Sequence, residues 1–213
     1  MKRLFFLWII LLTLLPVIAK AETASEQYQR DLVDRLMYLR GQGARPLSLQ
    51  EAGETPHCGT TLMFEASLNY RYLSDPYRSL ARQLFGRPPL PDSSVSPRNH
   101  FRIHYTTTGP DSVYQPHVDL GDGRGGGPNG IPDYIDSVAL IADSVYVFEV
   151  EHLGYMAPPS DEFYPAGGDS LYDIYVVNLG GGYYGATTRD EAIDGDPQRW
   201  TSFIELENDF SEL

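Results

Sequence analysis

The chain has 213 residues and a formal net charge of −13 at pH 7. This acidic excess argues against nucleic acids and anionic membrane surfaces as partners, because like charges repel. The single cysteine, Cys58, has no partner within the chain, so it is either a free thiol or paired with a residue elsewhere.

Residues 1–21 have the pattern of a secretory signal peptide. Lys2 and Arg3 form a basic start, residues 4–18 form an apolar run, and residues 19–21 read Ala-Lys-Ala, a small-x-small cleavage site. The apolar run is shorter than the ~20 residues that a membrane-spanning helix needs. We therefore expect a protein that is secreted or located in the cell envelope or periplasm, with no membrane anchor after cleavage.

Residues 22–95 are predicted to form a helical N-terminal segment that resembles a propeptide. The first helix is indicated by apolar residues that recur at helical spacing. A Pro- and Ser-rich stretch at residues 86–97 is predicted to be a linker. Whether the segment shields a cleft or merely packs as a collar is left open. The predicted helices cover residues 26–40, 62–72 and 76–85.

Residues 96–213 change to an alternation of strand-like and helix-like patterns. One strand is followed by a long helix, and three further strands come after that helix. This order predicts an α+β fold in which a long backing helix packs on one face of a twisted mixed sheet. The predicted strands cover residues 100–108, 171–179, 183–188 and 201–209, and the predicted helix covers residues 131–153.

The long helix carries one apolar stripe at helical spacing, which we expect to be buried against the sheet. Pro132 suits its first turn, and Gly154 suits its end. His152 continues the stripe, so it is interpreted as a structural residue. The stripe consists of Tyr134, Val138, Ile141, Val145, Phe148 and His152.

A glycine-rich acidic stretch precedes this helix and is a candidate calcium loop. Its second half matches the pattern of a calcium-binding loop, but Gly125 and Gly127 stand where the first carboxylates belong. An alternative needs no metal: Asn129 caps the helix, and the following aspartates favour its dipole. The candidate calcium ligands are Asp119, Asp122, Asn129, Asp133 and Asp136.

Other catalytic and cofactor motifs are weak or missing. A G-x-G-x-x-G match at residues 121–126 lacks the preceding strand, and its aspartates would repel phosphate. His100 and His104 are expected on one face of a strand, but two ligands do not complete a zinc site. None of the five histidines is followed by glutamate, so H-E-x-x-H is absent, and no G-x-S-x-G occurs.

Four blocks of the sequence resemble a known family. They are HCGTT, VSPRNHFRIHYTTTGPDSV, NGIPDYIDSVALIADSVYVFEVEHLGYMAPPSD, and the strand run GGDSLYDIYVVNL, YYGATT and TSFIELENDF. Together they are similar to the N-terminal part of a bacterial, myxobacterial-type family of secreted, zincin-like zinc metalloproteases. The resemblance covers about Cys58 to Phe210.

The resemblance implies that residues 96–213 are an incomplete zincin-like lobe. In the family, the strand matching TSFIELENDF leads into a helix with H-E-x-x-H, whose histidines bind zinc and whose glutamate is the general base. These positions do not exist among the 213 residues, so no catalytic residue is assigned. Zn²⁺ is expected only in a longer parent protein, and the chain itself is expected to be an inactive N-terminal fragment.

The resemblance also implies a peptide or protein substrate that adds to the edge strand of the sheet. The expected edge strand consists of Tyr183, Tyr184, Gly185, Ala186, Thr187 and Thr188. A second hypothesis stays open, in which the chain is a non-catalytic extracellular binding module that Ca²⁺ stabilises.

Overall fold

The computed structural model describes residues 22–53, 56–164, 168–193 and 196–210. The predicted signal peptide, residues 1–21, lies outside this range. Within the described residues, no helix is both long and apolar enough to cross a membrane.

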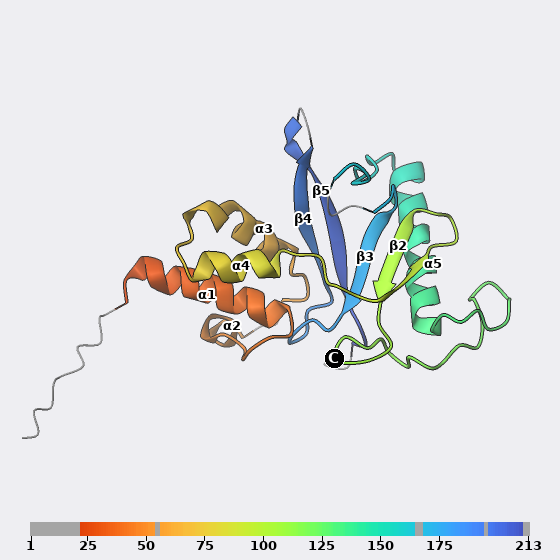
Figure 1. Ribbon diagram of the computed structural model, residues 1–213, viewed down its shortest axis with the longest axis horizontal. Coiled ribbons are helices and arrows are strands. Elements are labelled where there is room, and N and C mark those ends of the chain that lie inside the picture. Colours follow the sequence, from red (N-terminus) through yellow and green to blue (C-terminus); the bar gives the residue numbers. More distant parts are fainter. Residues whose placement is uncertain (1–21, 54–55, 165–167, 194–195, 211–213) are drawn as a thin grey trace, which may run out of the picture.

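Five strands form one mixed sheet in the order β1-β2-β3-β5-β4 (Figure 1). The three central strands β2, β3 and β5 run parallel, whereas β1 and β4 lie antiparallel at the two edges. The predicted α+β class and the predicted strands are confirmed. The strands are β1 (Asp92–Val95), β2 (Phe101–Tyr105), β3 (Tyr172–Val177), β4 (Gly185–Ile193) and β5 (Asp196–Glu207).

The predicted helices are also confirmed, with boundaries shifted by a few residues. Four helices precede the sheet, and α5 connects β2 to the parallel strand β3. Beyond α5 the chain continues as a π-helical turn, Val147–His152. The helices are α1 (Ala24–Leu39), α2 (Leu47–Glu51), α3 (Thr60–Asn69), α4 (Tyr77–Leu84) and α5 (Asp133–Tyr146).

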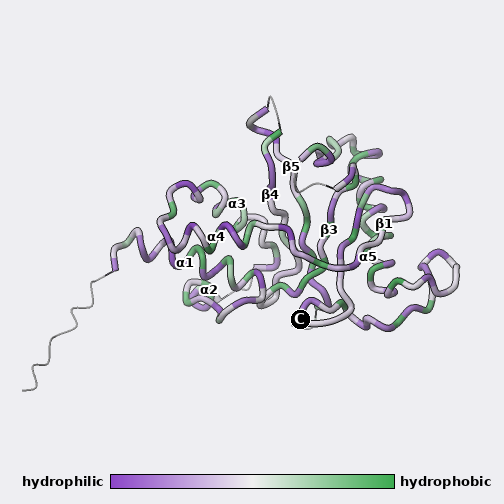
Figure 2. The backbone as a smooth tube through the Cα atoms, in the orientation of Figure 1, coloured by the Kyte–Doolittle hydropathy of each residue, from purple (hydrophilic) through white to green (hydrophobic). Residues whose placement is uncertain are grey.

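Two features of the sequence favour the helix α1: a capping box at its N-terminus and apolar residues at helical spacing. Thr23 accepts the N–H of Glu26 at 3.2 Å, and the Glu26 carboxylate accepts the N–H of Thr23 at 2.8 Å, which makes a capping box. Leu32, Leu36 and Leu39 then fall on one buried face. Figure 2 shows the alternation of hydrophilic and hydrophobic residues along α1.

Each face of the sheet has its own hydrophobic core. On one face, α1, α3 and α4 share a core with Tyr175, Val177 and Phe203 of the central strands. On the other face, α5 packs on Ile103 of β2 and Ile174 of β3. Because side chains alternate along a strand, neighbouring residues of β3 contribute to opposite cores. The helical N-terminal segment is therefore packed into the same core as the sheet.

The stretch 86–97 is not the free linker that its composition predicts. Its end forms β1, which pairs antiparallel with β2 over Asp92–Val95. Pro91 and Pro97 flank this short edge strand, so no ladder hydrogen bond is lost to proline. The predicted division between residues 95 and 96 consequently falls inside the connection of two paired strands.

Arg87 fastens the same stretch to the sheet. Its guanidinium pairs with three carboxylates: Asp161, Asp173 of β3 and Asp190 of β4. Burial by itself would lower the pKa of Arg87, but hydrogen bonds to Tyr175, Asp190 and Asp161 raise it. The Arg87 side chain is 11% exposed, so little water screens these pairs.

The apolar stripe of α5 packs differently from the prediction. Ile141 is 64% exposed and Phe148 is 57% exposed, and His152 also faces solvent. Of the predicted stripe, Val138 is buried and Tyr134 packs against the core, whereas the rest of the buried face consists of Ile135, Ala139 and Asp143.

Hydrogen bonds of Asp143, near the end of α5, account for the face that this helix turns toward the sheet. The Asp143 carboxylate accepts the Ser96 hydroxyl at 2.8 Å and the Arg98 N–H at 2.7 Å. These bonds turn Asp143 toward the β1–β2 connection, so the opposite flank of α5 points away from it. Sequence spacing reveals that an apolar stripe exists but not which flank meets the sheet.

We predict that Arg87→Met destabilises the fold strongly. It leaves the Asp161 and Asp173 carboxylates buried without their cation, which typically costs about 3–5 kcal/mol of unfolding free energy. Urea denaturation followed by circular dichroism measures the change. Arg82→Met is the matched control, because Arg82 is exposed on α4. Equal midpoints for the two variants would contradict the role assigned to Arg87.

Candidate functional site

The strand β4 lies at the edge of the sheet and pairs on its inner side with β5 alone. The expected edge strand, residues 183–188, therefore coincides with the start of β4 and the two residues before it. Tyr183, Ala186 and Thr188 are buried, at 2%, 3% and 1% exposure. Only the backbone of residues 184–187 is placed to bind an extended segment from outside.

That outer backbone is already paired within the chain. Tyr184 donates its N–H to the His57 carbonyl at 2.8 Å, and Gly185 accepts the N–H of Gly59 at 2.9 Å. Thr187 donates its N–H to the Thr60 hydroxyl at 2.9 Å. Residues 57–60 thus cover the part of the edge where a peptide is expected to add.

His57 adds side-chain contacts to this pairing. Its ring stacks on the Tyr184 ring with centroids 4.4 Å apart, and its Nδ1 lies 3.0 Å from the Gly182 carbonyl oxygen. Sequence reasoning did not place His57, Gly59 and Thr60 at this edge. The only available signal was that HCGTT is one of the four blocks carrying the family resemblance.

Gly59 shows why this crossing point is tight. A side-chain carbon at Gly59 would lie 2.6 Å from Cδ1 of Leu39 and 3.0 Å from Cβ of Ala186. Such distances are shorter than carbon atoms normally approach, so a side chain at Gly59 would force the Leu39 side chain in the core between α1 and β4 to shift. Cys58, the next residue back, is a free and exposed thiol.

The glycine-rich stretch before α5 folds around its own aspartates. Asp119 accepts the N–H groups of Asn129 at 3.0 Å and Gly130 at 2.7 Å. Asp133, the first residue of α5, accepts the N–H groups of residues 120 and 121 at 2.9 and 3.3 Å. Carboxylate-to-backbone bonds therefore close this loop.

The two other aspartates have local partners as well. Asp122 accepts the N–H groups of Arg124 and Gly126, both at 2.8 Å, and these bonds lower the pKa of Asp122. Asp136 accepts the side-chain amide of Asn129 at 3.0 Å, while burial raises the pKa of Asp136.

Asn129 is not the helix cap that the sequence predicts. The helix α5 begins at Asp133, and its N-cap position is Pro132. The Asn129 carbonyl oxygen instead accepts the N–H of Ile131 at 2.9 Å. This local turn, typical of asparagine, uses the side-chain oxygen before the helix starts.

The candidate calcium ligands hydrogen-bond to the chain itself. Their carboxylates point at backbone N–H or amide groups, and Gly125 and Gly127 have no side-chain oxygen to offer. Among the described residues, no group of three or more His, Cys, Asp or Glu side chains is arranged to hold a metal ion. Calcium coordination by this loop stays a prediction.

The two strand histidines do not share a face, contrary to the expectation. His100 stacks on Tyr146 of α5 with ring centroids 3.9 Å apart. His104 stacks on Tyr175 at 4.3 Å, on the opposite face, and its Nε2 lies 2.9 Å from Asp173 Oδ1. Strand alternation does not apply to His100, because it precedes the start of β2.

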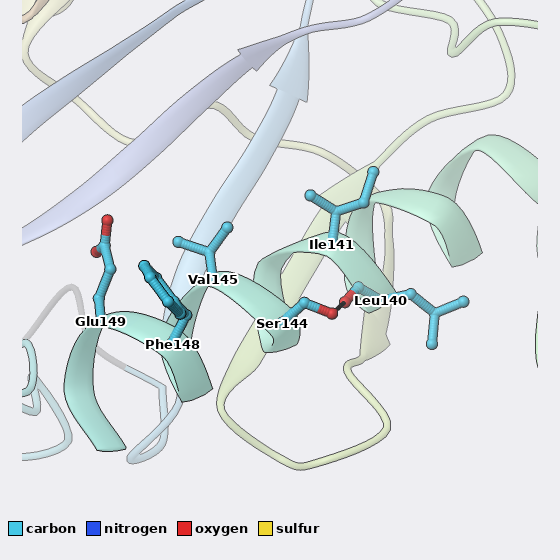
Figure 3. A pocket seen from close by; sticks show the side chains of 6 residues that line it. All are labelled: Leu140, Ile141, Ser144, Val145, Phe148 and Glu149. Atoms are coloured by element: carbon cyan, nitrogen blue, oxygen red, sulfur yellow. Dashed lines mark hydrogen bonds between the residues drawn. The ribbon is translucent and has the colours of Figure 1, made fainter. Parts of the chain in front are cut away.

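The exposed flank of α5 borders an open hollow of about 420 Å³. Figure 3 shows Ile141, Val145 and Phe148 projecting in a row from this flank. The same flank begins at Tyr134, whose hydroxyl donates to the Glu207 carbonyl of β5 at 2.7 Å. The apolar row therefore lies on the β5 side of α5.

The sheet beside this row is only partly covered. Ile204 and Leu206 of β5 pack against the core under α5 but are half-buried. The hollow itself is lined only by residues 140–149 of α5 and the turn that follows it, so the exposed row of α5 and the half-buried pair on β5 are two neighbouring areas of incompletely covered apolar surface. We call these two areas together the α5–β5 corner.

Comparison of the sequence with protein-family models and curated proteins, and of the fold with solved structures, gives no match. The geometry of the chain's own residues is therefore the basis for a functional proposal.

We predict that Asp119→Ala loosens the loop. It removes the acceptor for two backbone N–H groups, so the free energy of unfolding should fall by about 1–2 kcal/mol. Chemical denaturation measures this change. Glu151→Ala is the control, because Glu151 is an exposed carboxylate outside the loop.

Calcium coordination is tested by thermal melts of the wild-type chain in millimolar Ca²⁺ and in EDTA. Identical midpoints would reject it, since a ligand selective for the native state must raise the midpoint.

Glu207 predicts a pH dependence of stability. Burial raises the pKa of Glu207 to about 7, above the ordinary range of a glutamate. The stabilisation that the fold gains from protonated Glu207 is complete below the unfolded-state pKa of about 4.5. It is lost as pH rises through the folded-state pKa of about 7.

Glu207→Gln keeps an oxygen that can accept the Leu179 N–H, a bond of 2.7 Å in the wild type. Between pH 5 and pH 8 the free energy of unfolding of the wild type should therefore fall by roughly 2 kcal/mol relative to that of Glu207→Gln. Urea denaturation at both pH values measures this difference. Parallel stability profiles of the two proteins would contradict the prediction.

Proposed function

We propose that this chain is the N-terminal part of a secreted, zincin-like zinc metallopeptidase, inactive by itself. The observation that carries the proposal is the α5–β5 corner, an apolar site of the kind that a further helix covers. In the resembled family, the helix that follows the last strand bears the zinc-binding motif and packs on the sheet. The fold agrees in kind, with a mixed sheet, a long backing helix and an edge strand.

The direction of the chain supports the same occupant. The last residues of β5 lie at the first turn of α5, because Glu207 accepts the Tyr134 hydroxyl. A chain that leaves β5 there and turns back over the face that α5 occupies would meet the exposed flank of α5. It would then run beside α5 and cover Ile141, Val145 and Phe148.

Within this proposal, the residues present have supporting roles. The sheet and α5 form the scaffold, and the edge of β4 is the place where a peptide substrate would pair. No residue of the chain is assigned to zinc binding or to proton transfer. The zinc ion, held by the following helix, would supply Lewis-acid chemistry and an activated water.

The proposal is tested by substituting the corner in two contexts. In the 213-residue chain, Ile141→Glu with Phe148→Glu should change the unfolding free energy by less than about 1 kcal/mol, since both side chains face solvent. In the longer polypeptide encoded by the same gene, the two changes should destabilise by about 2 kcal/mol or more, because two charges become buried. Thermal and urea unfolding measure both.

Val138→Glu is the control, because Val138 is 9% exposed and should be intolerant of charge in either context. Two outcomes would refute the proposal. One is a gene with no H-E-x-x-H following β5. The other is a longer polypeptide as indifferent to the paired substitution as the shorter chain.

A further inference from the structure

A second hollow, of about 250 Å³, lies between the first turn of α5 and the turn at residues 114–118. It is smaller than the ~300–1,000 Å³ of sites for drug-sized ligands, so it suits a single side chain or head group. It shares no lining residue with the hollow beside the exposed row of α5. Its lining consists of Tyr114, Gln115, Val118, Asp133, Tyr134 and Ser137.

Two tyrosine rings form one corner of this hollow. The ring centroids of Tyr114 and Tyr134 lie 6.4 Å apart, and the ring planes are inclined at 68°. Tyr114 is 50% exposed, so a large part of its ring is open to a ligand from solvent. The faces of aromatic rings attract cations, and sites lined by such rings recognise ammonium groups. The corner therefore favours a positively charged ligand.

Asp133 supplies the charge of the hollow. Its Oδ1 accepts the N–H groups of Leu120 and Gly121 at 2.9 and 3.3 Å. Its Oδ2 has no hydrogen-bond partner among the residues that the structure describes. The lining contains no lysine, arginine or histidine. One carboxylate oxygen thus remains for a cation that contacts the tyrosine rings.

The start of α5 would by itself favour an anion, because the N-terminus of a helix is the positive end of its dipole. Here the first N–H of the helix, that of Asp133, already donates to the Val118 carbonyl at 2.9 Å. Arg124, the arginine of the preceding loop, lies 3.5 Å from the Asp122 carboxylate. The chain as a whole has a net charge of −13, which attracts cations. Three more aspartates belong to the same loop and first turn: Asp119, Asp122 and Asp136.

The walls of the hollow are fixed by bonds to other parts of the fold. Tyr114 donates its N–H to the Asn208 carbonyl at 2.9 Å, and the Tyr134 hydroxyl donates to a carbonyl of β5 at 2.7 Å. The N–H of Val118 donates to the Gln115 carbonyl at 2.9 Å, which closes the turn. Gln115 has a φ of 47°, and strained backbone of this kind occurs often at ligand clamps. A site that is already formed loses little entropy when it binds.

We propose that this hollow binds the ammonium or guanidinium group of a lysine or arginine side chain of a peptide or protein partner. The Tyr114 and Tyr134 rings contact the head group, and the Asp133 carboxylate neutralises its charge. The site goes beyond the proposed function, because it needs neither a zinc ion nor the edge of β4.

The probes are N-acetyl-lysine methylamide and N-acetyl-arginine methylamide, and the norleucine analogue is the uncharged control. An NMR titration of the 213-residue chain follows the signals of Tyr114, Val118 and Tyr134. The buffer contains EDTA, so that no divalent cation occupies the neighbouring aspartates. Either basic probe should shift these signals saturably, whereas the norleucine analogue should not.

Two variants separate the contributions of the ring and the charge. Tyr114→Leu removes one ring, and Asp133→Asn removes the charge but keeps an oxygen for the two backbone N–H groups. Each should weaken binding of the basic probe about twofold to fivefold, as expected for one cation–π contact or one exposed ion pair. Tyr155→Leu and Glu151→Gln are the matched controls, because both residues are exposed and lie outside the hollow. They should keep the wild-type affinity.

Three results would overturn the proposal. One is a norleucine analogue that binds as tightly as the basic probes, which would indicate a merely apolar hollow. Another is wild-type affinity in both Tyr114→Leu and Asp133→Asn. The third is the lack of saturable shifts at Tyr114 and Tyr134 with tens of millimolar basic probe. The test of the proposed function uses residues of the α5–β5 corner instead, so the two proposals can fail separately.

Discussion

The buried pairing of Arg87 with three carboxylates is the constraint on which the arrangement of the molecule depends. Arg87 lies between the last N-terminal helix and the first strand, and its partners come from β3, β4 and the segment before β3. A buried cation is tolerated only where its charge and hydrogen bonds are matched. The match fixes where the chain passes from the helices to the sheet, and thereby holds α1, α3 and α4 against one face.

The two faces of the sheet differ as a consequence. The face under the N-terminal helices is sealed, with Phe203 fully buried and the Arg87 guanidinium above its ring at 5.3 Å. The face under α5 is covered over β2 and β3, whereas Ile204 on β5 is half-buried. The helical segment that packs on the first face also brings residues 57–60 against the edge strand β4.

Sequence periodicity was sufficient for most of the helices and strands and insufficient for their contacts. The strands and helices could be predicted because apolar residues recur with the periods of the two structures. The strand β1 could not, because an exposed edge strand with serine and flanking prolines carries no apolar alternation. The rotation of α5 was also hidden, since the Asp143 tie to Ser96 joins residues far apart in sequence. Pairing of residues 57–60 with β4 is hidden for the same reason.

The acidic composition has a structural meaning that net charge does not reveal. Glu205 is completely buried and pairs with Arg40 of the α1 terminus, and Glu207 accepts the Leu179 N–H. In the loop before α5, Asp119 and Asp133 accept backbone N–H groups. A carboxylate with such partners fastens two segments together, because leaving a buried N–H unpaired is costly. The aspartates that give this loop its calcium-like spacing therefore also connect its two ends through hydrogen bonds to backbone N–H groups.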